Sequence, residues 1–333
     1  MIAKDINSVE FHLPEPIAVL ELTMTDGAIV RVRQHGNVAG PRLILSHGNG
    51  FAIDAYFPFW RHFLADCEVF VFDQRSHGWN PRHDGGHTQQ QMADDMQTLL
   101  RAIEARFGAR QSAGIFHSLS ATVSLLHSMR FGFQWDALIL VDPPLTPPLD
   151  HPLHSLARDF ELALGGWARQ RRQVFPSVHE LSSYFTGTRR MRRWVPGAAE
   201  LMARSITRAA SNGGIELVCP PEFEADIYVQ NSNSPAWSAL AAIAKDLFVL
   251  SSDYDEPDAD PPGRVSKALS AEFGIEGAPV RNTGHLLQIE RPEEAARIVQ
   301  QHLRVCGFEF APRATRRVTR GRPRARDYCS DSG

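Results

Sequence analysis

Hydrophobic residues along the chain gather into short runs rich in β-branched and aliphatic side chains, a pattern typical of buried strands. The first two runs are joined by Thr25-Asp26-Gly27-Ala28, whose Asp and Gly favour a hairpin, so we expect these two strands to be antiparallel neighbours. Eight runs are predicted to be strands: Ile17–Met24, Ile29–Gln34, Arg42–Ser46, Glu68–Phe72, Ser112–Phe116, Ala137–Asp142, Leu247–Ser251 and Ala278–Thr283.

Between the later strands, apolar residues recur at helical spacing. This alternation predicts an α/β fold with a mostly parallel eight-stranded sheet that is flanked by helices on both faces. An open sheet of this kind binds its ligands at the carboxyl ends of the strands, so functional residues are expected there. The predicted helices are Tyr56–Ala65, Gln89–Phe107, Ser118–Arg130, Pro262–Phe273 and Pro292–Val305.

After the sixth strand the alternation stops, and helical segments rich in Arg and aromatic residues replace it. We interpret residues 143–244 as a helical cap, or lid, inserted into an α/β core formed by residues 1–142 and 245–308, and we expect it to lie over the carboxyl edge of the sheet. Part of its aromatic set is expected to line an apolar substrate pocket. That set is Phe160, Trp167, Phe175, Tyr184, Phe185, Trp194 and Phe223.

The net charge of −3 hides an uneven distribution along the chain. Residues 311–333 contain seven Arg and two Asp, a charge of +5, which leaves −8 for the rest. Because this end is rich in Pro, Gly, Ser and Arg, residues 309–333 are predicted to be a disordered basic tail. Only Tyr328 is aromatic in residues 311–333, so we expect a solvated tail with no specific nucleic-acid partner.

Cysteine use and hydropathy predict a cytoplasmic protein. No stretch of about 18 apolar residues occurs, which predicts the absence of a membrane span, and no basic and apolar leader begins the chain. Four cysteines without a C-x-x-C pair are too few for a disulfide framework in 333 residues. The sequence does not decide between a monomer and a homo-oligomer.

Ser118 stands where a β-type run, residues 112–116, changes into a helical pattern. A sharp strand-to-helix turn lifts a serine hydroxyl out of the sheet and points the N–H of the next residue, Leu119, at a reacting carbonyl. Phe116 lies two positions before the serine, where this turn usually has glycine. Ser118 is therefore the candidate nucleophile, in a turn with an unusual neighbour.

Three other strand ends carry candidate residues. Residues 47–50 read His-Gly-Asn-Gly, a glycine turn in which the N–H of Asn49 can stabilise an oxyanion. Gly284-His285 follows the last strand and supplies a candidate general base. Residues 252–260 form an acidic loop, one member of which is expected to orient the histidine. Asp142 is the rival acid, although Asp142-Pro143-Pro144 is typical of a strand that ends and leads into the cap.

The order of a serine, an acid and a histidine, each just after a β-run, resembles the α/β-hydrolase arrangement from about Ile17 to Cys306. Residues 47–50 resemble the oxyanion loop HG-x of that family, and residues 116–121 resemble its elbow G-H-S-x-G-G, with Phe116 and Ser120 in place of two glycines. Residues 252–255 resemble its acid loop G-x-x-D, and residues 282–292 closely resemble its histidine loop.

This resemblance implies that Ser118 is the nucleophile, His285 the base and Asp255 the acid, rather than Asp253 or Asp258. It also implies that the backbone N–H groups of Asn49 and Leu119 form the oxyanion hole and that no cofactor or metal is needed.

The function predicted is hydrolysis of an ester or thioester of a small substrate with an apolar acyl or aromatic part, as in esterases and lipases. One alternative is hydrolysis of a carbon–carbon bond next to a ketone by the same triad. Another is a catalytically impaired hydrolase-fold protein that binds a ligand, which the bulky Phe116 favours.

Overall fold

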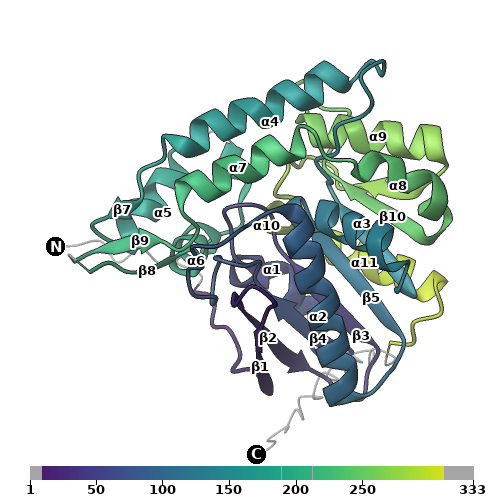
Figure 1. Ribbon diagram of the computed structural model, residues 1–333, viewed down its shortest axis with the longest axis horizontal. Helices are drawn as coiled ribbons and strands as arrows, with labels where there is room; N and C mark the ends of the chain where they lie inside the picture. The colour runs from purple at the N-terminus through teal and green to yellow at the C-terminus, as the bar shows by residue number, and fades with distance from the viewer. Residues whose placement is uncertain (1–9, 189, 212, 311–333) are drawn as a thin grey trace, which may run out of the picture.

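The computed structural model describes residues 10–188, 190–211 and 213–310. Its main sheet has eight strands in the order β1-β2-β4-β3-β5-β6-β10-β11 (Figure 1). β2 pairs antiparallel with β1 and β4, and the remaining neighbours are parallel. The strands are β1 (Ala18–Thr23), β2 (Ile29–Gly36), β3 (Arg42–Ser46), β4 (Glu68–Phe72), β5 (Ser112–His117), β6 (Ala137–Val141), β10 (Leu247–Ser251) and β11 (Glu276–Pro279).

The predicted eight-stranded sheet and its initial hairpin are confirmed, but the last strand lies earlier in the chain than expected. The last strand was expected over Ala278–Thr283, but it ends at Pro279, whose ring nitrogen carries no hydrogen to donate. After it, the N–H of Val280 still donates to the carbonyl of Ser251 (2.8 Å). The predicted basic tail lies outside the described residues from position 311 onward.

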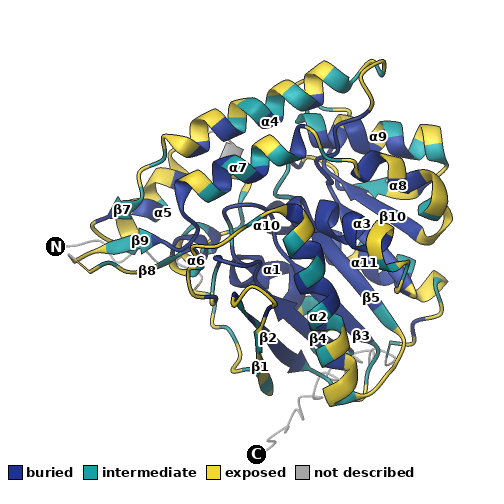
Figure 2. Ribbon diagram, in the orientation of Figure 1, coloured by how far each residue is buried: buried dark blue, intermediate teal, exposed yellow. Residues whose placement is uncertain are grey.

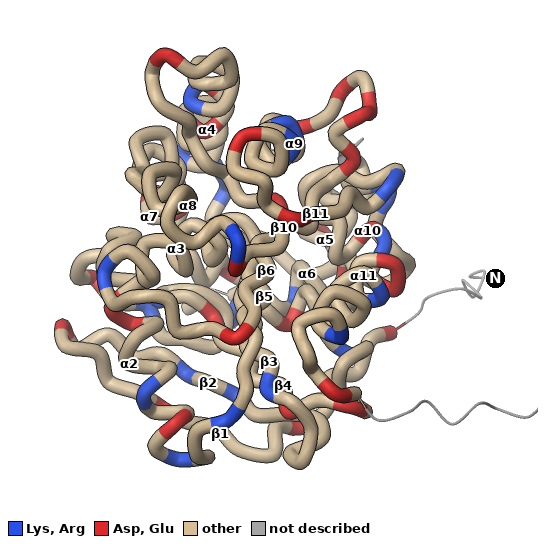
Figure 3. The backbone as a smooth tube through the Cα atoms, turned by 90° about the vertical axis from the view of Figure 1, so that its right-hand side faces the viewer, with Lys and Arg blue, Asp and Glu red and all other residues tan. Residues whose placement is uncertain are grey.

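Alternating side chains of the strands build two cores, one on each face of the sheet. In β3, Leu43 and Leu45 belong to one buried cluster and Ile44 to the other. One face is covered by α1 (Phe57–Trp60) and α11 (Pro292–Val305), and the other by α2 (Gln89–Phe107), α3 (Leu119–Phe131) and α9 (Pro261–Phe273). Figure 3 shows α2 and α3 on one side of the strands and α11 on the other. The sheet is thus buried on both faces (Figure 2).

Four of the five predicted helices are present within about one residue of their expected ends. The first of these four, α2, begins at a capping box in which the Thr88 hydroxyl accepts from the N–H of Gln91 and the Gln91 side chain accepts from the N–H of Thr88. The fifth prediction, Tyr56–Ala65, is only partly right. This segment is divided into a 3₁₀ turn (Ile53–Tyr56), the short α1 with Pro58, and a second 3₁₀ turn (Arg61–Phe63).

The segment between β6 and β10, residues 142–246, departs from the strand–helix alternation, as the sequence indicated. We call it the insertion. Besides its helices it contains an antiparallel three-stranded sheet that the helical interpretation missed, made of β7 (Val174–Phe175), β9 (Ile215–Leu217) and β8 (Thr207–Ala209). Its helices are α4 (His154–Arg169), α5 (Val178–Thr186), α6 (Ala198–Ser205), α7 (Pro221–Asn231) and α8 (Ala236–Ile243).

The insertion touches the carboxyl end of the sheet. In Figure 1, α4 and α7 run side by side across the top of the view, beyond the ends of the strands. The side-chain amide of Asn49, which follows β3, donates to the backbone carbonyl of Glu224 on α7 (2.8 Å). Among the described helices, none combines the length and the apolar character needed to cross a membrane.

Candidate active site

Ser118, His285 and Asp142 meet at the carboxyl end of the sheet, each just beyond a strand. Ser118 follows β5, Asp142 follows the adjacent β6, and His285 lies in the loop after β11. Ser118 Oγ is 3.0 Å from His285 Nε2, and His285 Nδ1 is 2.7 Å from Asp142 Oδ2. A carboxylate only accepts hydrogen bonds, so Nδ1 carries the proton and Nε2 is free to accept the hydrogen of the serine hydroxyl.

The turn at Ser118 has the strained backbone expected of a nucleophile between a strand and a helix. Its φ of 52° and ψ of −117° lie in a region that residues with a side chain rarely adopt. The surroundings hold this conformation, because the N–H of Ser118 donates to the carbonyl of Val141 (3.0 Å) and its own carbonyl accepts from Ala121 (2.9 Å). The predicted strand-to-helix turn is therefore present and directs the hydroxyl toward His285.

Phe116 is accommodated inside the core that lies under α2 and α3, away from the serine. Its fully buried ring packs edge-on against Phe72 and Trp135, with centroid distances of 6.3 and 5.3 Å. Gly114, two residues earlier on the same face of β5, leaves the necessary room, since a Cβ there would lie 2.5 Å from Phe116 Cε2. Phe116 occupies the position where the turn usually has glycine, and Gly114, two residues before it, provides the space for its ring.

We expect Gly114→Ala to lower the free energy of unfolding by about 2 kcal/mol, because the new methyl group overlaps the ring of Phe116. Adding Phe116→Leu should restore part of that loss, since the shorter side chain frees the space. Urea denaturation of both variants measures the effect. Gly166→Ala is the matched control: this exposed glycine of α4 has no neighbour within 4 Å of an added Cβ, so no loss is expected there. Unchanged stability of Gly114→Ala would contradict the packing argument.

The prediction that Asp255 orients His285 is wrong. Asp255 is exposed, and its carboxylate pairs with Lys267 Nζ (2.9 Å) and Arg281 Nη1 (2.7 Å). Those hydrogen bonds, from Arg281 first and then Lys267, hold the pKa of Asp255 below its ordinary value. The acidic loop turns away from the site because Asp253 is engaged by the backbone N–H of Asn282 (2.9 Å). The rival acid, Asp142, occupies the place beside the histidine.

Asp142 is fully buried and held by donors on both carboxylate oxygens. Its Oδ1 accepts from the N–H and the hydroxyl of Ser252, at 3.0 and 3.1 Å, while Oδ2 faces His285. Burial opposes a charge on the His285 ring, but the hydrogen bond to Asp142 and its negative charge more than offset this, so the pKa of His285 is raised above 6.5. This arrangement stabilises an imidazolium, which is what a general base becomes.

The loop predicted to bind an oxyanion lies beside Ser118. A Cβ placed on Gly48 would be 3.1 Å from Ser118 Cβ. Within the described part of the chain, the N–H groups of Asn49 and Leu119 donate to no other protein atom, so both remain available to a ligand. Both predicted donor groups therefore remain without a protein partner among the described residues at this end of the sheet.

Two buried histidines fix the shape of that loop and were not assigned this role from the sequence. His47 Nδ1–H donates to the carbonyl of Gly48 (2.8 Å), and its Nε2 accepts from the N–H of Gln74 (3.0 Å). His77 Nε2 accepts from the N–H of Gly50 (3.2 Å). Burial lowers the pKa of His47 to about 4 and that of His77 to about 3, so both stay neutral. Their hydrogen bonds therefore persist across the physiological pH range.

Polar side chains of the insertion gather near the site. On α4, Glu161 is buried, and burial raises its pKa to about 7 while Asn231 Nδ2 donates to it (2.9 Å). Next to the oxyanion loop, Arg171 pairs with Glu224, which is also buried. The insertion therefore brings charged groups as well as apolar ones to this end of the sheet.

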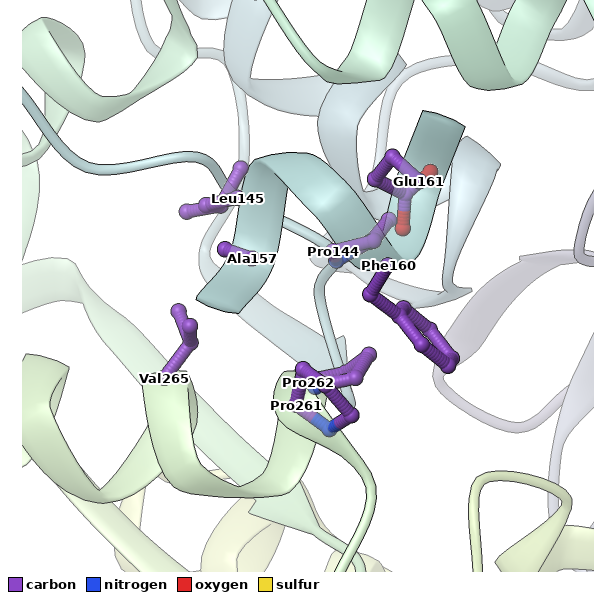
Figure 4. Close-up of a pocket in the computed structure, with 8 residues that line it drawn as sticks. All are labelled: Pro144, Leu145, Ala157, Phe160, Glu161, Pro261, Pro262 and Val265. Atoms are coloured by element: carbon purple, nitrogen blue, oxygen red, sulfur yellow. The ribbon is translucent and has the colours of Figure 1, made fainter. Parts of the chain in front are cut away.

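A small pocket between α4 and α9 lies next to the strand end that carries Asp142 (Figure 4). Figure 4 shows Phe160 and Glu161 on α4, opposite the α9 residues of the lining. Of the predicted aromatic lining, Phe160 is the member found in this pocket. The complete lining is Pro144, Leu145, Ala157, Phe160, Glu161, Pro261, Pro262 and Val265.

A family comparison agrees with the fold. The model of the alpha/beta hydrolase family matches residues 43–298, which include Ser118, Asp142 and His285. The chain belongs to the alpha/beta hydrolase family. No curated protein shows a significant match to the sequence.

Solved structures with this fold are similar over most of the chain. An E-2-(acetamidomethylene)succinate hydrolase has a TM-score of 0.69 at 18% identity and covers 86% of this chain and 100% of its own. The thioesterase domain from the curacin biosynthetic pathway has a TM-score of 0.66 at 15% identity and covers 85% and 99%. A thermophilic esterase from Thermogutta terrifontis has a TM-score of 0.64 at 20% identity and covers 87% and 99%. At these identities the likeness concerns the fold alone.

Proposed function

We propose that this protein is a serine hydrolase that cleaves an ester or thioester of a small substrate, with Ser118 as nucleophile, His285 as general base and Asp142 as the acid. The observation that carries the proposal is the continuous hydrogen-bonded series from Ser118 Oγ through the His285 ring to Asp142. Such a series activates a serine that is otherwise a weak nucleophile.

In the first half of the reaction, Ser118 Oγ attacks the carbonyl carbon while His285 Nε2 takes the hydroxyl proton. The imidazolium that forms is stabilised by Asp142 and then gives the proton to the leaving group, which departs and leaves an acyl-serine. In the second half, His285 deprotonates a water molecule that attacks this ester. The imidazolium then returns the proton to Ser118 Oγ as the bond to the acyl group breaks and the carboxylic acid is released. The N–H groups of Asn49 and Leu119 are proposed to stabilise both oxyanions, at about 3 kcal/mol per donor.

The insertion is proposed to act as a cap that shields this chemistry from water. Support comes from the low exposure of Ser118, 6%, and from the contact between α7 and the oxyanion loop. We propose a substrate with an apolar acyl or aromatic part, in keeping with the apolar side chains, Phe160 among them, that lie between α4 and α9 near the end of β6.

Carbon–carbon bond hydrolysis next to a ketone is the second candidate, because the same three residues serve it. The catalytically impaired alternative loses its main support, since Phe116 packs away from the turn and Ser118 keeps its contact with His285. The similar structures include a hydrolase, a thioesterase and an esterase by name, which is consistent with acyl transfer but identifies no substrate for this chain.

A panel of p-nitrophenyl esters and acyl thioesters of increasing chain length tests the proposal, together with labelling of the folded protein by a fluorophosphonate. We expect one equivalent of label on Ser118 and turnover of at least one ester. Labelling abolished by heat unfolding would show that the reactivity depends on the site. No labelling of folded protein and no turnover would overturn the proposal.

The pH dependence of kcat/KM should show an acid limb with its midpoint above pH 6.5. His285 must be neutral to accept a proton, and its pKa is raised by Asp142, so activity is lost as the pH falls through that raised value. Asp142→Asn should move the limb to lower pH, because the negative charge is removed. Initial rates between pH 5 and 9, at substrate concentrations well below KM, measure it. A wild-type limb below pH 6.5 would contradict the assignment of His285 and Asp142.

A further inference from the structure

A buried series of hydrogen bonds connects the oxyanion loop to the loop that carries His285. The N–H of Gly48 contacts the Tyr56 hydroxyl oxygen (3.2 Å), and that oxygen lies 2.8 Å from His117 Nδ1. On the other side of the same ring, His117 Nε2 lies 2.9 Å from the backbone carbonyl oxygen of His285. Tyr56 and His117 are both fully buried, so these contacts take place without solvent.

The direction of each hydrogen bond follows from which groups can donate. A carbonyl oxygen only accepts, so His117 Nε2 carries the proton and donates to His285. Burial keeps the pKa of His117 well below 6.5, the nearby His285 adding to this, so the ring is neutral and its Nδ1 must accept from the Tyr56 hydroxyl. The hydroxyl oxygen in turn accepts from Gly48. Tyr56 and His117 thus each accept one hydrogen bond and donate another, and all the bonds run in the same direction, from Gly48 to His285.

This series connects parts of the chain that are far apart in sequence. The proposed reaction requires these parts to keep a fixed position relative to each other. Gly48 precedes the proposed oxyanion donor Asn49, and a Cβ on Gly48 would lie 2.9 Å from His117 Nδ1, so the loop rests directly on the ring. The rings of His117 and His285 are 4.7 Å apart. A shift of about 1 Å in such groups can cost about 100-fold in rate.

We propose that Tyr56 and His117 are positioning residues that hold the oxyanion loop and the base loop at a fixed separation around Ser118. The inference rests on the proposed function of Ser118 and His285. Neither side chain is needed for proton transfer to or from the substrate. Their contribution is to place groups that act directly, so it should appear in kcat more than in KM.

Two substitutions break the series at one shared link. Tyr56→Phe removes the hydroxyl that joins Gly48 to His117 and keeps the aromatic ring. His117→Gln keeps an N–H donor for the carbonyl of His285 but has no nitrogen at the ring position Nδ1, which accepts from Tyr56. We expect each to lower kcat about 10-fold to 100-fold with KM changed less than about 3-fold. The double variant should be no worse than the poorer single variant, because both changes remove the same connection.

The matched control is Phe59→Leu, a change at a fully buried side chain of the same hydrophobic cluster that carries no polar atom and so takes no part in the hydrogen bonds. It should lower the thermal midpoint while kcat is retained. Unchanged kcat in both Tyr56→Phe and His117→Gln, with thermal midpoints lowered as in Phe59→Leu, would mean that the series is only structural and would overturn the proposal.

Nitrogen-15 NMR of histidine-labelled protein tests the same inference without turnover, so its failure is separable from failure of the proposed hydrolase activity. We expect His117 to be neutral with the proton on Nε2 between pH 6 and 8. Tyr56→Phe should also shift the ring resonances of His285, and Phe59→Leu should not. A proton on Nδ1 of His117, a charged ring, or unmoved His285 resonances in Tyr56→Phe would each overturn it.

Discussion

Replacing Ser118 by alanine is expected to lower kcat by about 10⁶-fold on any ester the protein turns over. The hydroxyl is the atom that bonds to the substrate carbonyl, and it lies 3.0 Å from the nitrogen that takes its proton. Without it no acyl-serine forms, and what remains is the effect of binding and of the oxyanion donors on direct attack by water. KM should change little, because alanine leaves the pocket and the loop contacts intact.

Ser124→Ala is the matched control for this experiment. Ser124 lies on α3, the helix that follows Ser118. It is fully buried, and its hydroxyl donates to the carbonyl of Ala121 (2.8 Å) within that helix. It should keep full activity and accept the fluorophosphonate label, whereas Ser118→Ala should lose both. Equal turnover by Ser118→Ala and the unaltered protein would exclude the serine mechanism.

Replacing Asp142 by asparagine is expected to lower kcat by about 10⁴-fold. The amide is nearly isosteric, but its nitrogen can donate to His285 Nδ1, which favours the tautomer with the proton on Nε2. In that tautomer the ring cannot accept the hydrogen of Ser118, and no carboxylate remains to stabilise the imidazolium. The loss should therefore be in kcat, with the fold and KM largely retained.

Asp255→Asn is the comparison that separates the two acids. Asp255 is exposed and paired with Lys267 and Arg281, so its replacement removes only surface ion pairs and should change kcat less than about 3-fold. Steady-state kinetics and urea denaturation of both variants decide the matter. A large loss in Asp255→Asn together with full activity in Asp142→Asn would return the role to the acidic loop.

The strands and most helices were predictable because their signals are local. β6 is a continuous apolar run, and α2 has both a capping box at Thr88 and a terminal Gly108 with a φ of 80°. The small sheet of the insertion was missed because β7 has only two residues, and a pairing partner cannot be recognised in so short a segment. The order of the strands in the sheet was also not predicted, because it depends on which strands pair in space.

Ser118 and His285 could be named as candidates from the sequence because Ser118 directly follows a strand and His285 lies in a loop that resembles a family motif. The acid was misassigned because two strand ends carry aspartates. Asp142 and Asp255 both fit the order serine, acid, histidine, and motif resemblance favoured Asp255. In the structure β6 lies directly beside β5 and brings Asp142 to the histidine. Asp142 was visible as a rival at its strand end. A sequence does not tell which way a side chain leaves a loop.

By itself the sequence determined the α/β alternation, the inserted segment, the turn at Ser118 and the loop of His285, because these depend on periodicity and on residues a few positions apart. Only the tertiary structure decided that Asp142 is the partner of His285, that Gly114 makes room for Phe116, and that Tyr56 joins two distant loops. These are contacts between side chains brought together by packing of the sheet, and their energies depend on burial and direction, which no local pattern encodes.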